Sequence, residues 1–413
     1  MRHGSPSTEA PKRVSRAQRT KEVQADISAA ALKLLGTKGV DGLALTKIAS
    51  EAGMSNGPLY GRYDSPEDVA LELWEGPIRD RFHLLLDEAT RFALGDAPEP
   101  SEWLLAEMTH PSAESLAVLE TLAVARRYPM LAESVRTEVE SALGKIRPES
   151  PTIAFSAIYP WVTLPLGAII YSGMLPSNSP PWSEALRLGR QAAIEATGPE
   201  FAGSPPEPIE LSLPIPDSGD LGLDQFVTAV MNVVARVGYE KTTAQRVARA
   251  AGHSFSSAYT HVGSKDELMT FAITAMIDQI IMTGDLSFLG LTGEARFRAM
   301  IALELGLVSD KNRALRQLRA ESLIAARHHD DLGDALRTRF TESIAHIQAS
   351  DIEGTGTNHP ALTFWHAARA HGIASVLLSM NTPSLDDVDW TPFGTMVNEF
   401  TRLTATSKDG LHR

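Results

Sequence analysis

Apolar residues recur at helical spacing along most of this 413-residue chain. A representative run is Leu116, Leu119, Leu122 and Ala123, where apolar positions return within one helical turn. Alternation of apolar and polar residues, which marks half-buried strands, is scarce. The pattern therefore predicts a nearly all-α protein.

One helical pattern of 44 residues occurs twice without gaps. The copies cover 26–69 and 225–268, so they lie 199 positions apart. The positions identical in both are Ala30/Ala229, Gly39/Gly238, Ala49/Ala248, Ala52/Ala251, Gly53/Gly252, Ser55/Ser254, Tyr60/Tyr259 and Ser65/Ser264. A second register, offset by 201, relates Ala125-Arg126, Leu131 and Arg136 to Ala326-Arg327, Leu332 and Arg337. The repetition predicts that two protomers have been fused into one polypeptide.

Each copy places glycine where the backbone geometry is demanding. Gly39 and Gly238 follow an apolar-periodic helix, where a positive φ is cheapest for glycine. Gly53 and Gly252 follow a short helix and permit a tight turn. A third helix is expected to begin at a serine N-cap, Ser55 in the first copy and Ser254 in the second. Helix, tight turn and capped helix form a helix-turn-helix, whose second helix can enter a DNA major groove.

At these positions the chain resembles the tetracycline-repressor (TetR) family of transcriptional regulators. The head of that family has an apolar helix, glycine, Thr-Thr, Ile-Ala, Ala-Gly, serine, Leu-Tyr, an aromatic residue and Ser-Lys. The first copy matches with Gly39, Ile48-Ala49, Ala52-Gly53, Ser55, Leu59-Tyr60 and Tyr63, and the second with Gly238, Thr242-Thr243, Val247-Ala248, Ala251-Gly252, Ser254, Tyr259 and Ser264-Lys265. The resemblance implies two units per chain, each a helix-turn-helix head with a helical ligand-binding and dimerisation body, paired as a pseudo-dimer.

The resemblance and the residue types predict which side chains face double-stranded DNA. In the first head they are Thr46, Lys47, Ser55, Asn56, Gly57, Pro58, Tyr60 and Arg62, and in the second Thr242, Thr243, Arg246, Ser254, Phe255, Ser256, Ser257, Tyr259, His261 and Lys265. Asn56 and Arg62 offer donors to base edges or phosphates. By resemblance, the Tyr60 hydroxyl lies on a phosphate; the alternative is that Tyr60 packs against its own head. Leu59 and Tyr63 are assigned to the core of the head.

The two heads differ in the residues that would contact DNA. The first head has Leu43 and Ala44 where the family has threonines, and Pro66 at the lysine position, so fewer phosphate contacts are expected from the head itself unless the basic arm supplies them. Because base readout depends on the side chains of the recognition helix, unlike heads predict a non-palindromic operator. In the alternative hypothesis one head makes no DNA contact, and the protein acts as a dimer of chains or as a protein-interaction or ligand-carrier module.

The charge is unevenly distributed along a chain whose net charge is −13. Residues 1–70 carry 10 basic and 8 acidic groups and residues 221–270 carry 5 and 4, whereas the remainder carries 23 and 39. Only the heads are net positive. The basic residues that precede the first head are Lys12, Arg13, Arg16, Arg19 and Lys21. This arm either lies along phosphates or a minor groove, or is a solubilising tail.

These patterns divide the chain into seven segments. They are a flexible basic arm (1–20), the first head (21–70), the first regulatory body (71–197), a linker (198–220), the second head (221–270), the second body (271–405) and a tail (406–413). The linker holds six prolines, five acidic residues and no basic residue. It is therefore expected to be stiff and extended.

The resemblance also implies that the last two helices of each half form a four-helix bundle. These are 151–175 with 182–196, and 360–380 with 391–404. The first of them has no charged residue and is long enough to raise a transmembrane alternative. Pro160 and Pro165 interrupt it, however, so a helix buried in an interface is preferred and no membrane partner is expected.

A small-molecule effector that separates the heads is a further implication of the resemblance. The residues that could line its pocket are Trp103, Met108, Tyr128, Trp161, Tyr171, Phe297, Phe340, Trp365 and His366. The alternative is that these side chains fill the core. The sequence does not identify the effector.

Other chemistries have little support in the sequence. No cysteine is present and the N-terminus does not look like a signal peptide, so a cytoplasmic protein without disulfides is expected. Glycine-rich phosphate loops, nucleophile elbows and zinc-protease motifs are missing from the sequence, which argues against an enzyme. The histidine spacings do not suit a metal site, and no cofactor is expected. The sequence therefore predicts a ligand-responsive transcriptional repressor.

Overall fold

The computed structural model describes most of the chain. The described residues are 16–146, 153–175, 181–196, 206–210, 213, 216–253, 267–275, 291, 293–349, 359–378 and 388–411. The regular elements within them are all helical, so the predicted all-α class is confirmed. Across these residues, no helix has the combination of length and hydropathy that a bilayer span requires.

The first half contains a four-helix head followed by a body. The head helices are α1 (Arg16–Lys38), α2 (Leu45–Glu51), α3 (Gly57–Tyr60) and α4 (Pro66–Leu73). The body helices are α5 (Arg79–Leu94), α6 (Glu102–Thr109), α7 (Ala113–Val124), α8 (Pro129–Ile146), α9 (Phe155–Tyr171) and α10 (Trp182–Glu195). Short 3-10 turns at Val40–Gly42 and Ala125–Arg127 follow α1 and α7.

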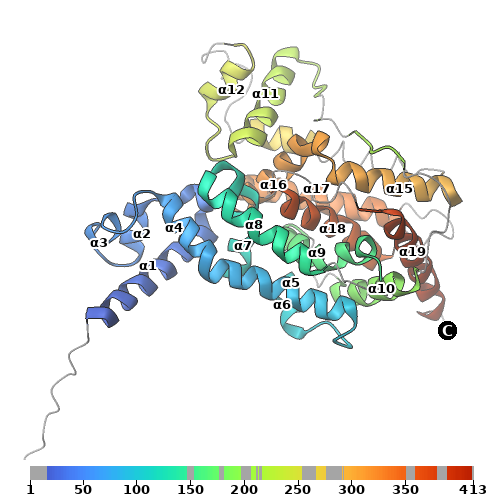
Figure 1. The fold of residues 1–413 in the computed structure, drawn as a ribbon. Coiled ribbons are helices and arrows are strands. Elements are labelled where there is room, and N and C mark those ends of the chain that lie inside the picture. The colour runs from blue at the N-terminus through green and yellow to red at the C-terminus, as the bar shows by residue number, and fades with distance from the viewer. Residues whose placement is uncertain are drawn as a thin grey trace, which may run out of the picture.

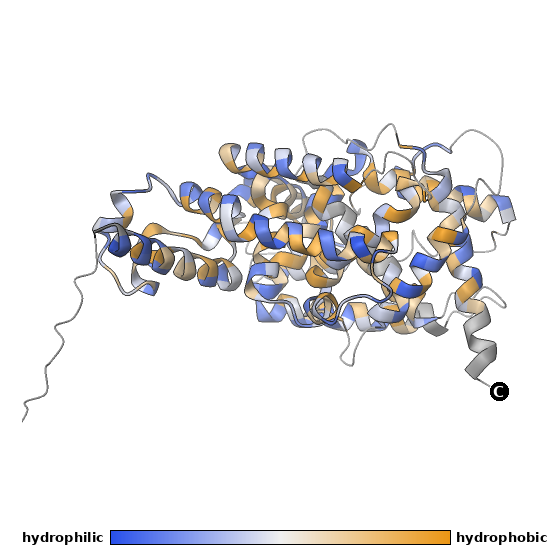
Figure 2. Cartoon of the chain, turned by 60° about the horizontal axis from the view of Figure 1, so that its bottom comes forward, coloured by the Kyte–Doolittle hydropathy of each residue, from blue (hydrophilic) through white to orange (hydrophobic). Residues whose placement is uncertain are grey.

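The second half is also helical where it is described. Its helices are α11 (Leu221–Val237), α12 (Ala244–Ala250), α15 (Gly293–Val308), α16 (Arg313–His328), α17 (Asp330–Ala349), α18 (Pro360–Leu378) and α19 (Thr391–Leu411). Figure 1 shows α1–α4 projecting from one side of the helical body and α11 with α12 projecting from another. In Figure 2 hydrophobic residues dominate the centre of the body, and hydrophilic residues lie mostly along its outer helices.

Local sequence signals explain how the first head joins its body. Ser65 and Asp68 form a reciprocal capping box that starts α4, with Pro66 in the first turn, where its missing N–H costs nothing. Trp74–Ile78 is a short π-helical segment in which Gly76 leaves the helical region (φ −122°, ψ −113°) and Pro77 follows. The chain therefore passes from α4 to α5 through a kink of identifiable cause.

Two expected boundaries were wrong. The helix α1 begins at Arg16, inside the segment expected to be a flexible arm, because the residues after Pro11 contain no helix breaker up to Gly36. At the other end α19 continues to Leu411, inside the expected tail. Extending an existing helix costs little compared with nucleating one, so both helices run past the point where apolar periodicity fades.

The centre of the molecule is a crossing of α9 and α18, and α10 and α19 pack beside them. A Cβ atom on Gly167 would lie 1.6 Å from the carbonyl oxygen of Ala368, and one on Gly372 would lie 2.2 Å from that of Thr163. Each glycine thus faces the carbonyl four residues before the other glycine. The contact between α9 and α18 is therefore reciprocal at these two glycines.

Aromatic pairs around the crossing repeat this reciprocity. Tyr159 of α9 contacts Trp390, which precedes α19, with ring centroids 6.3 Å apart and nearly perpendicular rings. Conversely, Phe364 of α18 contacts Trp182 of α10 at 5.9 Å in the same geometry. Each half therefore places an aromatic residue from its first bundle helix against a tryptophan from the other half. The four predicted bundle helices do pack together.

Part of the linker lies on the second body. The Ile209 N–H donates to the Ala302 carbonyl at 3.0 Å, and the Asn312 amide donates to the Ile209 carbonyl at 3.0 Å. Lys311 pairs with Glu210 at 2.6 Å. The described stretch 206–210 is thus held against α15 and the 3-10 turn that follows it.

Candidate nucleic-acid interface

The first head is built around a small apolar core that leaves one surface for other contacts. Ile27 of α1, Ile48 of α2 and Val69 of α4 are buried, and α1 packs against both α2 and α4. Leu59 of α3 is fully buried and Tyr63 nearly so. The prediction that these two residues belong to the core is confirmed.

Glycines form the turns of both heads as predicted. Gly39 has φ +67° and Gly238 has φ +85°, each with ψ near 170°, a region that only glycine enters readily. Gly53 and Gly252 have φ +64° and +74°. The two copies therefore share backbone geometry at both glycine positions, not only residue identity.

The predicted N-cap of the third helix was wrong. The residue at the N-cap of α3 is Asn56, and it makes no side-chain capping hydrogen bond. Its backbone is helical (φ −65°, ψ −25°), whereas a capping side chain needs an extended backbone to reach back to the first turn. Ser55 and Asn56 therefore keep their polar groups on the exposed surface of the head.

The residues predicted to face DNA in the first head all lie on its surface. Those residues, exposed without exception, are Thr46, Lys47, Ser55, Asn56, Gly57, Pro58, Tyr60 and Arg62. The Tyr60 side chain is 57% exposed, so the alternative that it packs inside its own head was wrong. The residues come from α2, the turn before α3, α3 itself and the stretch that follows it.

Arg62 is held by a polar cluster that the sequence did not suggest. Its guanidinium donates to the side-chain oxygen of Gln24 on α1. The Gln24 amide donates to the Tyr63 hydroxyl at 2.8 Å, and that hydroxyl donates to Glu72 at 2.9 Å. Burial and the neighbouring Glu72 carboxylate raise the Tyr63 pKa, and the hydrogen bond from Gln24 opposes them only in part. Gln24 and Glu72 lie on α1 and α4, too distant in sequence for any spacing rule to reveal them.

The two threonines of the second head form hydrogen bonds within the head itself. Thr242, predicted to face phosphate, is buried, and its hydroxyl donates to the Gly238 carbonyl at 2.7 Å. That prediction was wrong because the hydroxyl is used to close the turn after α11. Thr243 is the N-cap of α12 and accepts from the Arg246 N–H at 3.3 Å, while the Arg246 guanidinium donates to the Lys241 carbonyl. Both Thr243 and Arg246 remain exposed.

The other contacts predicted for the second head lie outside the described residues. They are Ser254, Phe255, Ser256, Ser257, Tyr259, His261 and Lys265.

The residues predicted to line an effector pocket are packed against other side chains. Trp161 stacks on Trp365 with centroids 5.0 Å apart, and Tyr171 meets Phe340 at 4.8 Å. Arg81 lies 5.4 Å over the Trp103 ring. Met108 and Phe297 are buried, Tyr128 lies at the junction of the two heads, and the His366 side chain lies outside the described residues. The effector pocket stays a prediction.

A shallow depression lies elsewhere on the surface. It has a volume of about 260 Å³ and is lined by Phe92, Pro98, Arg187, Arg190, Gln191, Ile194 and Glu195. None of the predicted pocket residues belongs to it. Over the described part of the chain, no group of three or more His, Asp or Glu side chains is arranged to hold a metal ion.

Comparison with known proteins agrees with the geometry of the first head. Residues 27–73 match the family described as "Bacterial regulatory proteins, tetR family". The matched stretch begins within α1 and ends with α4, so it covers the helix-turn-helix and the helix that leads into the body. No curated protein matches the chain. The chain therefore carries a TetR-type head of the kind found in DNA-binding transcriptional regulators.

Proposed function

We propose that this protein is a ligand-responsive TetR-type repressor whose two halves form an intramolecular pseudo-dimer on duplex DNA. The structure of the first head is the observation that supports the DNA-binding part of this proposal. It matches the tetR family, buries Leu59 and Tyr63, and leaves Asn56, Tyr60 and the rest of the α3 face exposed.

The pseudo-dimer is supported by the bundle. In a TetR-type homodimer, equivalent helices from two chains would meet around a two-fold axis. Here the reciprocal contacts of Gly167 and Gly372 join α9 to α18 within one chain. The offset between these glycines is 205, close to the 199 and 201 of the sequence repeats, as expected if the halves descend from one ancestor.

The two heads would read unlike half-sites. Thr242 is buried and Thr243 caps α12, so the second head contacts phosphate with a different set of groups from the first. An operator with two unequal halves follows, because each half-site is specified by its own recognition helix.

The effector is the least constrained part of the proposal. A ligand that lowers DNA affinity must bind more tightly to the splayed state than to the DNA-bound state. The stacked Trp161 and Trp365 lie at the bundle centre, where such a ligand would have to part packed rings.

The proposal is tested by selecting bound sites from random duplexes and by measuring the mass of the protein–DNA complex. Recovery of an asymmetric site, occupied by one chain in native mass spectrometry, is the expected result. Affinity should also fall steeply as salt rises, because phosphate contacts release counterions. A chain that binds no duplex at low salt would refute the DNA-binding function.

A second candidate function follows from the second head. Its Thr242 is buried and its Thr243 caps α12, which leaves this head with fewer groups for phosphate contacts. If only the first head contacts DNA, two chains must occupy one operator. That arrangement gives a palindromic selected site and two chains per duplex. The same mass measurement therefore separates the two proposals.

A further inference from the structure

One guanidinium lies between the two heads. Arg127 ends the 3-10 turn after α7, and its Nη2 forms an ion pair with Asp41 of the first head at 2.6 Å. Its Nη1 donates to the carbonyl of Val237, the last residue of α11 in the second head, at 2.7 Å. The Arg127 and Asp41 side chains are only 5% and 7% exposed. A cation is also favoured at the carboxyl end of α11, where the helix dipole is negative.

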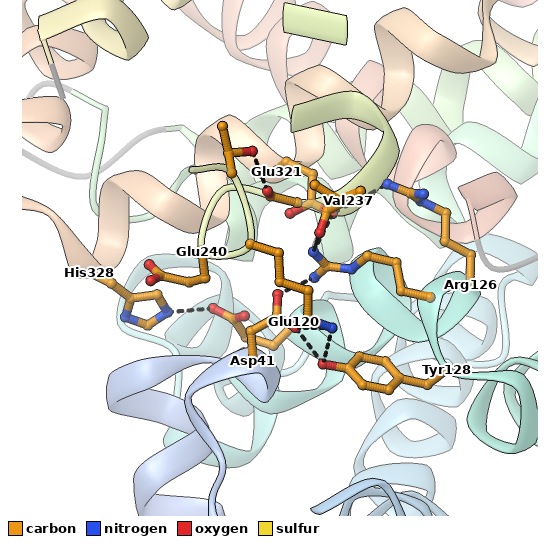
Figure 3. Close-up of polar contacts among 12 residues, drawn as sticks. Asp41, Glu120, Arg126, Tyr128, Val237, Glu240, Glu321 and His328 are labelled. Carbon is orange, nitrogen blue, oxygen red and sulfur yellow. Dashed lines mark hydrogen bonds and ion pairs between the residues drawn. The ribbon is translucent and has the colours of Figure 1, made fainter. Parts of the chain in front are cut away.

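The heads also touch each other directly. Lys241 of the second head lies 3.2 Å from Asp41, and its ammonium donates to the Tyr128 hydroxyl at 3.1 Å. That ammonium lies 4.4 Å over the Tyr128 ring, within the range of a cation–π contact. The Tyr128 hydroxyl donates in turn to Asp41 (Figure 3). We call Asp41, Arg127, Tyr128, Val237 and Lys241 the head clasp.

The backbone of the second head is shaped around this guanidinium. A Cβ atom on Gly238 would lie 1.3 Å from the Arg127 Nη1, so any other residue here would displace the guanidinium from its position. The positive φ of Gly238 adds a second reason for glycine. The contact is therefore built into the fold and is not a chance approach of a long surface side chain.

The position equivalent to Arg127 in the second half is occupied by His328, which lies beside the first head. Glu120 and Glu321 lie 201 residues apart, as do Arg127 and His328. Across the halves, His328 bonds to Glu120 at 2.9 Å and Arg127 lies 3.6 Å from Glu321 (Figure 3). Gly39 faces the first of these pairs and Gly238 the second. The guanidinium bridge thus occurs on one side of the approximate two-fold axis, and a histidine replaces it on the other.

Neighbouring charges balance the buried arginine. Arg126 donates to the carbonyl of Ala235 at 2.7 Å and to Glu321 at 3.4 Å (Figure 3). Arginine and carboxylate groups buried together are tolerated only when each is paired, so removing one partner is costly. Reorientation of the heads would have to break these contacts together.

We propose that Arg127 is a positioning residue that clasps the two heads in one orientation and so fixes the half-site spacing that the chain accepts. The effect on DNA rests on the proposed function, whereas the fixed orientation does not. The clasp holds Asp41 beside the start of α2 and Val237 at the end of α11, so the helices that follow each point keep one relative placement.

The orientation is measured without DNA. The chain has no cysteine, and the exposed residues Ser50 on α2 and Arg249 on α12 are 199 positions apart. Spin labels on Ser50→Cys and Arg249→Cys should give a single narrow distance distribution by double electron–electron resonance. Arg127→Gln should broaden it. Arg402→Gln is the control, because it removes an exposed ion pair with Glu195 that also joins the halves but lies far from the heads in sequence. Its distribution should remain narrow.

Loss of folding is separated from loss of the clasp by a compensated variant. Circular dichroism and thermal unfolding identify an Arg127→Gln chain that fails to fold. The double variant Arg127→Gln/Glu321→Gln removes the charge of both members of the buried Arg127–Glu321 pair and should fold with the same broad distribution. An unbroadened distribution in a folded chain that lacks Arg127 would overturn the proposal.

The DNA arm uses the selected operator with base pairs inserted or deleted between its halves. Each base pair rotates one half-site by about 34° relative to the other, since B-DNA turns once in about 10.5 base pairs. The parent should lose about tenfold or more in affinity when one base pair is inserted, as the two heads cease to bind together. Arg127→Gln should lose less than about threefold, with unchanged affinity for a single half-site. An identical spacing profile in both proteins would overturn the role on DNA. If neither binds any duplex, the proposed function fails, while the resonance distances still decide whether the clasp exists.

Discussion

The backbone of α18 occupies the space where Gly167 would carry a side chain. The Ala368 carbonyl oxygen would lie 1.6 Å from a Cβ atom at Gly167, and the Gly372 nitrogen would lie 2.9 Å from it. Backbone cannot swing aside as a flexible side chain does. The two central helices can approach this closely only because both residues at the crossing are glycine.

Gly167→Ala should therefore destabilise the fold although alanine is the better helix former. Forcing α9 and α18 apart should lower the free energy of unfolding by about 3 kcal/mol, as overpacking in a close-packed core does. Denaturant unfolding measures the loss. Gly144→Ala in α8 is the matched control, because nothing lies within 4 Å of its added methyl group. It should gain up to about 1 kcal/mol from helix propensity. Equal stability of the two variants would contradict the close crossing.

Tyr60 should contribute affinity without sequence preference. It is exposed on α3, so Tyr60→Phe removes a hydroxyl without disturbing the core. Loss of one hydrogen bond to phosphate should weaken DNA binding about tenfold. Because tyrosine is neutral, the dependence of affinity on salt should not change. Binding isotherms at several salt concentrations and a repeat of site selection check both statements.

Lys47 provides the matched comparison for Tyr60. It is exposed on α2, and Lys47→Gln removes a charge instead of a hydroxyl. If the ammonium contacts a phosphate, the slope of log affinity against log salt should become shallower by about 1. A selected site that changes in Tyr60→Phe, or a salt slope that is unchanged in Lys47→Gln, would remove these residues from the phosphate contacts.

Periodicity and glycine placement were sufficient to predict the helical fold and the head turns, whereas the four bundle helices were implied by the resemblance to the TetR family. Those features depend on local backbone geometry, and a residue such as Gly53 indicates that geometry in the sequence. The errors fell where one side chain had two possible uses. Thr242 was assigned to phosphate by resemblance, yet its hydroxyl closes a turn by bonding the Gly238 carbonyl. Ser55 was expected to cap α3, but the helical backbone of Asn56 leaves that cap unformed.

The contacts between the halves were beyond sequence reasoning. Arg127 and Val237 are 110 residues apart, and neither belongs to a local motif that indicates the other. The repeat offset of 201 did relate Arg126 to Arg327, one position from the residue that bridges the heads. It did not indicate that Arg127 and His328, the equivalent residues of the two halves, each lie beside a glutamate of the other half. Such pairings depend on how two bodies dock, which is a property of the tertiary structure.

Gly238 should be less tolerant of substitution than Gly53. Both have positive φ, so alanine carries a backbone penalty of about 1–3 kcal/mol at either position, the larger at Gly238, whose ψ of 164° lies in the region that only glycine enters readily. Only Gly238 has a guanidinium atom within 1.3 Å of the added methyl group, whereas nothing lies within 4 Å at Gly53. Gly238→Ala should therefore cost more stability than Gly53→Ala in thermal unfolding. In an Arg127→Gln/Glu321→Gln background the difference should shrink, because the clashing guanidinium has gone. A difference that persists in that background would assign the cost to the backbone alone.

Glu321 should make the stability of the folded chain depend on pH near neutrality. Burial raises the pKa of its carboxyl from 4.5 to about 7, against the opposing attraction of Arg127 and Arg126. Between pH 4.5 and about 7 the folded state therefore keeps a proton that the unfolded state has released. Stability falls with rising pH wherever the folded state binds more protons. The contribution of Glu321 should be fully present below pH 4.5 and lost by about pH 7, a change of at most about 3 kcal/mol.

Glu321→Gln removes this proton and should flatten the corresponding part of the profile. Denaturant unfolding at pH 5.0 and pH 7.5 in both proteins measures the difference, with buffers matched at about 0.15 M ionic strength. Glu133→Gln, which removes an exposed carboxylate on α8, should leave the slope between the two pH values unchanged. A slope of the same size in the parent and in Glu321→Gln would show that the proton resides elsewhere. A flat profile in the parent between these two pH values would mean that Arg126 and Arg127 keep Glu321 ionised in the folded state, because the folded and unfolded chains would then bind the same number of protons.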